Sequence, residues 1–326
     1  MYKIKLRPED FFVEELCDLS IKDTGDYCYF AMEKKNWNTM DVIKTLANRL
    51  RINQKRFNVA GMKDKNAVTR QVFSVFRVPK NAVLRIKIRD VHFEFLGYGD
   101  ERLKLGQIIK NRFRIVVRNL ASRKYRNINF IENYYDEQRF GGKNQLVGKA
   151  LVKKEFSNVC SMLKLNVNKN DYIGAIRNNL DKKMLIFYIN AYQSMLFNKL
   201  IAEYVKIRSD STFKVGYETG EFIFSNKEIK NKKIPLIGFL SVIRDREIKK
   251  LYERILREEE VSKEDFLFPM MPELGSEGNE RDFIVEVNVK AKYEDDDMNE
   301  GRYKAILDFA LNRGSYATIV VKKMFG

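Results

Sequence analysis

The stretch Arg56 to Val78, with the sequence RFNVAGMKDKNAVTRQVFSVFRV, contains two β-like runs separated by a turn. Residues 56–60 predict one strand, and residues 70–78, which are rich in Val and Phe, predict another. Gly61 permits the sharp change of backbone direction between them. We therefore expect Asp64 on a loop that joins two strands.

Lys63 and Lys65 flank Asp64 directly. Nearby cations favour the ionised form of a carboxylate, and such a carboxylate can act as a nucleophile or base toward a polyanionic substrate. The same residues also suit an ordinary charged surface turn, because turns commonly carry Gly, Asp and Asn. Asp64 is the leading candidate for a catalytic residue.

The composition indicates a globular protein with a length typical of about two domains. The chain has 326 residues, of which 44% are hydrophobic. It contains no apolar run of about 18 residues, and its first residues lack the apolar stretch of a signal peptide. We therefore expect a cytoplasmic protein without a membrane segment.

Few residues are suited to metal or cofactor chemistry. Three cysteines without CxxC spacing indicate free thiols, and the one histidine, His92, lies in an alternating strand-like run. A single histidine argues against hydrolase triads and multi-histidine metal sites. The segment Arg139 to Lys143 carries two glycines but matches neither a P-loop nor a GxGxxG turn. The sequence thus indicates neither a cofactor nor a metal.

The charge favours a nucleic-acid partner. Lys and Arg number 61 against 44 Asp and Glu, a net charge of +17, and residues 1–143 hold 30 of the basic residues and 17 of the acidic ones. Localised positive charge favours a phosphate backbone, while 16 Tyr and 23 Phe offer stacking surfaces for unpaired bases. The alternative is a lysine-rich protein with no polyanionic partner.

Alternating apolar residues predict most of the first third of the chain as strands. One helix interrupts them at residues 39–50, with Thr39 as its expected N-cap. In the strand at 111–118, the arginines Arg112, Arg114 and Arg118 share one face, which predicts a positively charged surface. The further expected strands are residues 11–15, 26–33, 85–88 and 92–98.

From Asn144 the pattern becomes helical, and near the C-terminus it returns to strands. Strands are expected at 283–289 and 316–321, and the acidic residues 293–297 predict a solvated hairpin loop. This order indicates an inserted domain whose flanking pieces form one sheet. The expected helices are residues 144–151, 173–179, 183–204 and 248–259, with a strand pair near 216–224.

Five segments resemble, in the same order, motifs of the TruD family of pseudouridine synthases. They are Lys5 to Phe11, Ala60 to Gln71, Asn111 to Phe113, Asn133 to Gly141 and Gly314 to Thr318. Ala191 to Asn198 is also similar to the family. Tyr135-Asp136 stands where the family commonly has Phe-Gly, so Asp136 must tolerate a positive φ if the glycine has one.

The resemblance implies an α/β (α+β) fold. A pseudouridine synthase catalytic domain with a mixed, mainly antiparallel sheet, residues 1–143 plus 279–326, is interrupted by an inserted α-rich TRUD domain, residues 144–278.

The resemblance also implies roles for individual residues. Asp64 corresponds to the catalytic aspartate, Lys5 to the basic residue beside it, Asn111 to a positioning residue and Phe113 to an aromatic residue against the target base. Tyr316 is expected to confine the base as well. The residues expected to contact RNA phosphates are Arg70, Arg112 and Arg114, and those expected to contact RNA at the junction of the domains are Gln138, Arg139 and Phe140.

The implied reaction is the isomerisation of uridine to pseudouridine in tRNA at uridine 13, without cofactor, metal, membrane or obligatory protein partner. Whether the aspartate attacks the sugar, attacks the base or removes a sugar proton stays open at this point. Two other functions also fit the basic surface: a non-catalytic RNA-binding protein and a metal-dependent nuclease. The nuclease is disfavoured because Asp64 has no acidic companion in its loop.

Overall fold

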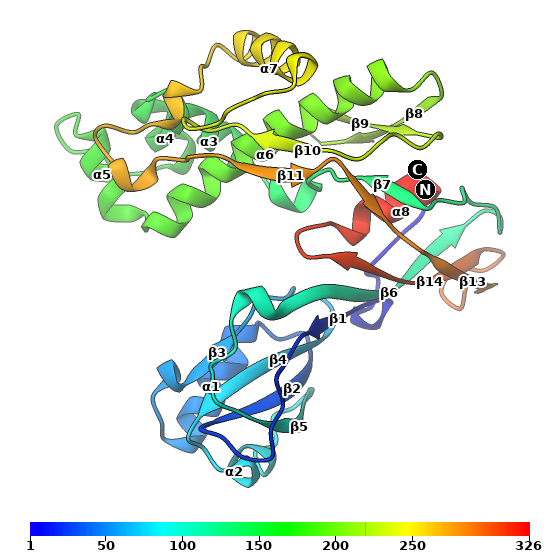
Figure 1. Cartoon of the computed structure of the whole chain (residues 1–326). Helices are drawn as coiled ribbons and strands as arrows, with labels where there is room; N and C mark the ends of the chain where they lie inside the picture. The colour runs from blue at the N-terminus through cyan, green and yellow to red at the C-terminus, as the bar shows by residue number, and fades with distance from the viewer. Residues whose placement is uncertain (219) are drawn as a thin grey trace. The chain divides into compact units, whose positions relative to one another are not determined.

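The computed structural model of the chain describes residues 1–218 and 220–326 and divides into two compact units (Figure 1). The first unit consists of Met1–Asn129, Val287–Ala317 and Phe325; the second consists of Phe130–Glu286, Thr318–Met324 and Gly326. The predicted insertion, residues 144–278, lies wholly within the second unit. That unit also includes residues on both sides of the predicted insertion, because β7 pairs with β12 there.

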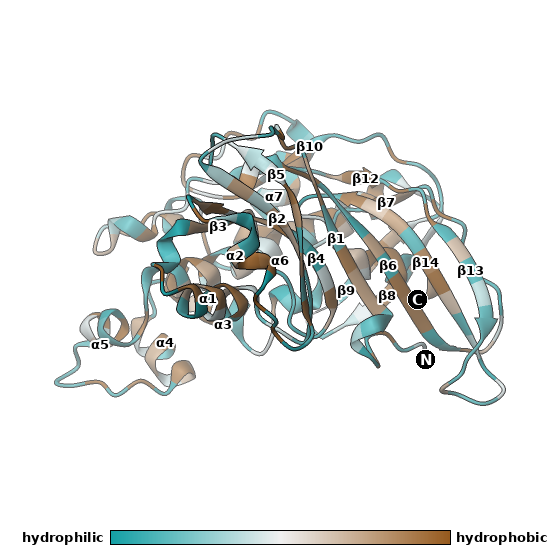
Figure 2. Cartoon of the chain, turned by 90° about the horizontal axis from the view of Figure 1, so that it is seen from below, coloured by the Kyte–Doolittle hydropathy of each residue, from teal (hydrophilic) through white to brown (hydrophobic). Residues whose placement is uncertain are grey.

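The first unit is built on an eight-stranded sheet with the order β13-β14-β6-β1-β4-β2-β5, and β3 pairs with β4 (Figure 2). Only β1 and β4 run parallel, so the predicted mixed, mainly antiparallel sheet is confirmed. Pairing of β14 with β6 joins the two ends of the chain in one sheet, as expected. The strands are β1 (Phe11–Cys17), β2 (Tyr27–Lys35), β3 (Phe57–Val59), β4 (Val68–Phe76), β5 (Val91–Gly99), β6 (Ile108–Leu120), β13 (Lys290–Asp295) and β14 (Tyr303–Asn312).

Helix α1 (Thr39–Leu50) forms where the sequence predicts it and packs its apolar stripe on the sheet. Its buried Val42, Ile43 and Leu46 belong to the same core cluster as Phe30 of β2. This arrangement is expected for an amphipathic helix over a half-buried sheet. The short helix α2 (Lys80–Leu84) adds Val83 to the same cluster.

Two details of this region differ from the prediction. The N-cap of α1 is Asn38 rather than Thr39, because the Thr39 hydroxyl donates to Gln71 Oε1 at 2.7 Å and is fully buried. Residues 85–88 do not form a strand; they follow α2, and Ile88 makes only an isolated bridge to Val91. The side chain of Ile88 is nevertheless buried. The alternation of apolar residues in this segment therefore reflects burial and not a paired β-strand.

The second unit combines helices with pairs of short strands. Its helices are α3 (Asn144–Val152), α4 (Phe156–Leu163), α5 (Tyr172–Asn179), α6 (Lys182–Arg208) and α7 (Arg246–Glu258), and most of helix α8 (Ala317–Phe325) belongs to it. The strand pairs are β7 (Phe130–Glu132) with β12 (Ile284–Glu286), β8 (Thr212–Tyr217) with β9 (Gly220–Ser225), and β10 (Lys233–Leu236) with β11 (Asn279–Asp282). No helix in the described residues has the length and apolar character needed to cross a bilayer.

Helix α6, with 27 residues, is the central element of this unit. It begins at Asp181, whose side chain accepts from the Met184 amide at 2.7 Å, as expected for an N-cap. Gly148 of α3 lies so close to α6 that an added Cβ would sit 2.0 Å from the Tyr188 carbonyl oxygen. The two helices can therefore approach closely only because this position is glycine.

The predicted strand at 316–321 is wrong, because Tyr316 lies just before helix α8 and residues 317–321 begin that helix. The β-branched residues there favour a strand locally, but their contacts suit a helix. Lys322 Nζ donates to Asp136 Oδ1 at 2.6 Å, and Lys323 Nζ donates to Oε2 of the fully buried Glu132 at 2.9 Å. Helical spacing also buries Ile319, Val320 and Met324, so tertiary contacts outweigh local propensity.

Two further predictions about charge are wrong, and they are linked. Arg118 does not extend a positive surface, and the loop after β13 is not wholly solvated. The Arg118 guanidinium is buried and donates to Asp10 at 2.9 Å, to Asp296 at 2.8 Å and to Asp297 at 2.7 Å. The acidic loop thus neutralises Arg118, and Asp296 is buried in the process.

Candidate active site

Asp64 lies on the loop between β3 and β4, as the sequence predicts. Its Oδ2 atom accepts a hydrogen bond from Lys5 Nζ at 3.0 Å, and the two side chains are 35% and 26% exposed. Lys5 has a φ of 56°, an uncommon conformation for a residue with a Cβ. Its ammonium also lies 4.1 Å from the centre of the Phe11 ring. The carboxylate is thus paired with a cation yet still accessible to a ligand.

The backbone of the loop is anchored by buried polar side chains. Lys34 Nζ donates to the Asp64 carbonyl oxygen at 3.1 Å and to that of Trp37 at 2.7 Å. Gln71 Nε2 donates to the Gly61 carbonyl at 3.2 Å. Because both ends of the Gly61–Asp64 segment are held from the sheet, the position of the carboxylate is set by β2 and β4.

Lys34 is unusual because a lysine this deeply buried, 1% exposed, normally pairs with a carboxylate. Among the described residues no carboxylate lies within ion-pair distance of its ammonium group. Desolvation lowers the pKa of Lys34 to about 8, with Lys63 lowering it further and Asp64 opposing the shift. The lysine that holds the Asp64 backbone therefore changes charge in mildly basic solution.

The side chain of Lys63 points to β1 and β6. Its Nζ atom lies 2.9 Å from Glu15 Oε1 and donates to Asn111 Oδ1 at 2.7 Å. The Glu15 carboxylate is fully buried, and its other oxygen accepts from the Val72 amide at 3.3 Å. Asn111, predicted as a positioning residue, is thus brought to the loop that carries Asp64.

Phe113 shares a sheet face with Asn111, because it stands two positions further along β6. In the register of β1 and β6, Asn111 is opposite Glu15 and Phe113 is opposite Val13. Phe113 is only 7% exposed and packs edge-on against Phe11, with the ring centres 6.3 Å apart. It also stacks on Phe309, with the ring centres 5.6 Å apart. Phe113 is therefore a core residue below the site.

The three arginines expected to contact phosphates are not brought to Asp64. Arg112 and Arg114 alternate with Asn111 and Phe113 along β6, so they face the other side of the sheet. Arg112 pairs with Asp308 at 2.8 Å, and Arg70 pairs with Glu14 at 3.3 Å and with Glu94. A cavity of about 560 Å³ on that side is lined in part by Arg112 and Arg114.

Gln138, Arg139 and Phe140 lie at the 3₁₀ turn Glu137–Arg139 and the residue that follows it, in the second unit. Phe140 is buried and packs against Tyr217 at 6.2 Å, whereas Gln138 is exposed. Arg139 is half-buried and donates to Ser194 Oγ at 3.3 Å. Asp136 has a φ of −87°, so the positive φ considered for it does not occur.

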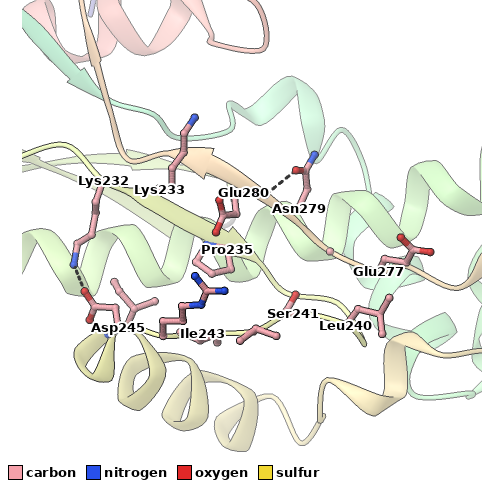
Figure 3. Close-up of a pocket in the computed structure, with 14 residues that line it drawn as sticks. Lys232, Lys233, Pro235, Leu240, Ser241, Ile243, Asp245, Glu277, Asn279 and Glu280 are labelled. Atoms are coloured by element: carbon pink, nitrogen blue, oxygen red, sulfur yellow. Dashed lines mark hydrogen bonds and ion pairs between the residues drawn. The ribbon is translucent and has the colours of Figure 1, made fainter.

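Tyr316 and the cavities of the second unit are separate features of the chain. Tyr316 is half-buried at the link between β14 and α8. In the second unit, a cavity of about 750 Å³ is lined by Lys232, Asp245 and the segment Leu240–Ile243 (Figure 3). None of the residues predicted to act in catalysis lines it. The described residues contain no group of three His, Cys, Asp or Glu side chains able to hold a metal ion.

Sequence reasoning missed Glu15, Lys34 and Gln71, although Glu15 and Lys34 left a signal. Glu15 continues the inward-facing alternation of Phe11 and Val13, and Lys34 continues that of Phe30 and Met32. A charged residue at an inward position of a strand is rarely buried unless it is paired or hydrogen-bonded. Such positions could have been flagged as parts of a polar network.

Comparison with known proteins identifies the family of the chain. The family model for tRNA pseudouridine synthase D (TruD) matches residues 2–163 and 159–324. A Methanosarcina acetivorans protein named "Probable tRNA pseudouridine synthase D" is 26% identical over 98% of this chain and 92% of its own length. An Aquifex aeolicus tRNA pseudouridine synthase D is 27% identical over 99% of this chain and 98% of its own.

The fold agrees as well. The crystal structure of a Methanosarcina mazei protein, also named tRNA pseudouridine synthase D (TruD), superposes with a TM-score of 0.75 at 23% identity, covering 98% of this chain and 92% of that one. At this identity the similarity establishes the fold alone. Because the family model spans nearly the whole chain, the chain belongs to the TruD family of tRNA pseudouridine synthases, which are isomerases.

Proposed function

We propose that this protein converts uridine to pseudouridine in tRNA with Asp64 as its catalytic carboxylate. The observation that carries the proposal is the accessible Asp64 carboxylate held 3.0 Å from the Lys5 ammonium group. A charge-assisted hydrogen bond from lysine favours the ionised carboxylate and restricts its direction. The Lys34 contact with the Asp64 backbone supports the same geometry.

The reaction breaks the bond between uracil N1 and ribose C1′ and joins uracil C5 to C1′. The proton on C5 is lost and N1 gains one, so the product has the same atoms as the substrate. A base inside a stacked helix cannot reach a side chain, so the nucleotide must be flipped out. Asp64 can begin the reaction by attacking C1′, by attacking the base or by removing a sugar proton, and each route needs an ionised, accessible carboxylate.

The proposal extends to the substrate position and to the domains. The target is uridine 13 of tRNA, as the similarity of the motifs to the TruD family implies. The first unit carries the chemistry, and residues 144–278 are the family-specific insertion. Gln138 and Arg139 contribute RNA contacts from the second unit, and Arg70, Arg112 and Arg114 contact phosphates on the sheet face away from Asp64.

The test compares the wild type with Asp64→Asn and a matched control, Asp23→Asn, which changes an exposed carboxylate of the same unit. Each protein is incubated with tRNA in chelator, and pseudouridine is mapped along the product. We expect the wild type and the control to modify uridine 13 without changing the mass of the RNA. We expect Asp64→Asn to form no pseudouridine while binding tRNA within a few-fold of the wild type.

Other outcomes would refute the proposal. Substantial turnover by Asp64→Asn would remove the catalytic assignment. Chelator-sensitive shortening of the RNA would indicate a nuclease, and tight binding without covalent change would indicate an RNA-binding protein. A tRNA with cytidine at position 13 that is still modified elsewhere would remove the assignment of the target.

A further inference from the structure

Only one Phe, Tyr or Trp side chain is exposed in the part of the chain that the structure describes. The sequence contains 23 Phe, 16 Tyr and 1 Trp, yet within residues 1–218 and 220–326 only Tyr125 is exposed, at 42%. Folding buries or half-buries the other rings there, as expected for large apolar side chains. The stacking surface that the composition offers to unpaired bases is therefore most accessible at Tyr125.

The Tyr125 ring packs against two other rings of the first unit. Its centre lies 5.4 Å from that of Tyr293 on β13 and 6.5 Å from that of Phe325, with interplanar angles of 31° and 33°. Because these contacts restrict the ring, a ligand that stacks on its exposed part costs little side-chain entropy. Tyr125 thus forms a preorganised platform for a planar group.

The loop that carries this ring, residues 121–129 between β6 and β7, is positively charged. It contains Arg123, Lys124 and Arg126 and no Asp or Glu. Arg123 pairs with Asp295 at 3.2 Å, which anchors the loop to β13. Lys124 and Arg126, which flank the ring, are both exposed. A ring between two exposed cations matches a nucleotide, because its base can stack and its phosphate is an anion.

This platform is too far from Asp64 to hold the target base itself. Tyr293 is opposite Ala305 in the pairing of β13 with β14, and Ala305 is opposite Val117 in the pairing of β14 with β6. Val117 stands six positions after Asn111, whose side chain meets the Asp64 loop, and six residues of a strand span about 20 Å. Both places belong to the first unit. A nucleotide on the platform must therefore differ from the one that reaches Asp64.

We propose that Tyr125, Lys124 and Arg126 bind one unpaired nucleotide of the tRNA at a second site, with its base stacked on Tyr125 and its phosphate beside the two cations. This inference rests on the proposed function, because it takes tRNA as the ligand. Stacking on an aromatic ring tolerates every base, so the site adds affinity and orients the RNA without reading its sequence. A contact about 20 Å from Asp64 restricts how the substrate lies over the first unit.

The experiment measures RNA binding and catalysis separately. The Kd for tRNA is measured at several salt concentrations, and the rate of pseudouridine formation is measured in single turnovers with saturating enzyme. We expect Tyr125→Ala to raise Kd by about 5-fold or more, the effect of losing one base–aromatic stack, with an unchanged salt slope and saturated rate. Tyr125→Phe keeps the ring and should keep the wild-type Kd. Lys124→Gln should reduce the slope of log Kd against log salt by about 0.7, the value for one phosphate of a single strand.

Two variants of the same unit serve as matched controls. Leu84→Ala shortens an apolar side chain of similar exposure, 41%, and Lys55→Gln removes an exposed lysine. Both should keep the wild-type Kd and salt slope. Cross-linking of the wild type to tRNA with ultraviolet light, followed by mass spectrometry, should attach a nucleotide to Tyr125. An abasic residue at that position of the tRNA should then raise the Kd of the wild type but not that of Tyr125→Ala.

The opposite results would overturn the proposal. An unchanged Kd in Tyr125→Ala, with the variant folded by thermal melting, would assign the exposed ring to a protein contact or to no contact. An equal rise of Kd in Leu84→Ala, or a cross-link to the target uridine alone, would overturn it too. If the wild type binds tRNA but forms no pseudouridine, the proposed function fails while the binding measurements still test this site, so the two failures are distinguishable.

Discussion

Lys34 and Asp64 are 30 positions apart in the chain, yet the Lys34 ammonium group donates a 3.1 Å hydrogen bond to the Asp64 carbonyl oxygen. The same ammonium group also donates to the Trp37 carbonyl. The buried Lys34 thus fixes the backbone of the loop by binding two carbonyl groups, while Lys5 pairs with the Asp64 carboxylate. The position of the Asp64 loop therefore depends on a group that titrates.

The lowered pKa of Lys34 predicts a specific pH dependence of activity. Its pKa is lowered to about 8, chiefly by desolvation, so above this pH its hydrogen bonds to the loop lose their charge assistance. We expect kcat for pseudouridine formation to fall above about pH 8 in the wild type. In Lys34→Met this limb should disappear, although the overall rate is lower. A limb that persists unchanged in the variant would assign it to another group.

Lys34 also predicts a pH dependence of stability with the opposite sign. An unfolded lysine holds its proton up to about pH 10.5, whereas Lys34 in the folded state releases it near 8. Between these values the unfolded chain binds more protons, so stability rises with pH. The free energy of unfolding of the wild type minus that of Lys34→Met should be flat below pH 8. It should then rise by up to about 3 kcal/mol toward pH 10.5, as measured by urea denaturation.

Lys5→Met should impair catalysis without unfolding the protein. The Lys5–Asp64 pair is partly exposed, and such pairs stabilise folded proteins by about 1 kcal/mol or less. Loss of one positioned group at a reacting centre typically lowers the rate by about 100-fold or more. Lys22→Met, which breaks an exposed ion pair with Asp100, is the control and should change neither quantity much. Single-turnover kinetics and thermal melting would measure both.

Arg118→Met should be strongly destabilising. The guanidinium and the carboxylates of Asp10 and Asp296 are almost fully buried, so removing the arginine leaves negative charges unpaired in the interior. Breaking such a cluster typically costs about 3–5 kcal/mol. Arg112→Met on the same strand breaks the more exposed pair with Asp308 and should cost less than about 1 kcal/mol. Equal losses of unfolding free energy in the two variants would contradict this reasoning.

Substitutions at Phe113 can distinguish a role in core packing from a direct contact with the target base. Phe113→Ala should destabilise the protein by about 3–5 kcal/mol, because the ring is 7% exposed between Phe11 and Phe309. Phe113→Leu and Phe309→Leu should both be milder. If Phe113 touches the flipped base, Phe113→Leu should lower kcat/KM for tRNA more than Phe309→Leu at a temperature where both are folded. Equal effects on kcat/KM would leave Phe113 a packing residue only.

Regular local patterns were sufficient to predict many elements of this protein. The stripe of Val42, Ile43 and Leu46 predicts α1, and the alternation of Phe113, Ile115 and Val117 predicts β6. In both cases the apolar period matches the geometry of the element that buries it. The five ordered motifs, from Lys5–Phe11 to Gly314–Thr318, likewise predicted the family, because together they extend over nearly the whole chain.

Only the tertiary structure decided what each side chain meets. A period of two placed Arg118 on a face but could not reveal that Asp10 and Asp296 neutralise it. Local β propensity at residues 316–321 was outweighed by the partners of α8 in the second unit. The union of Glu15, Lys63 and Asn111 likewise depends on pairing between β1 and β6. Local sequence sets the conformation of a segment, but contacts between distant segments follow from sheet register and burial, which no single stretch encodes.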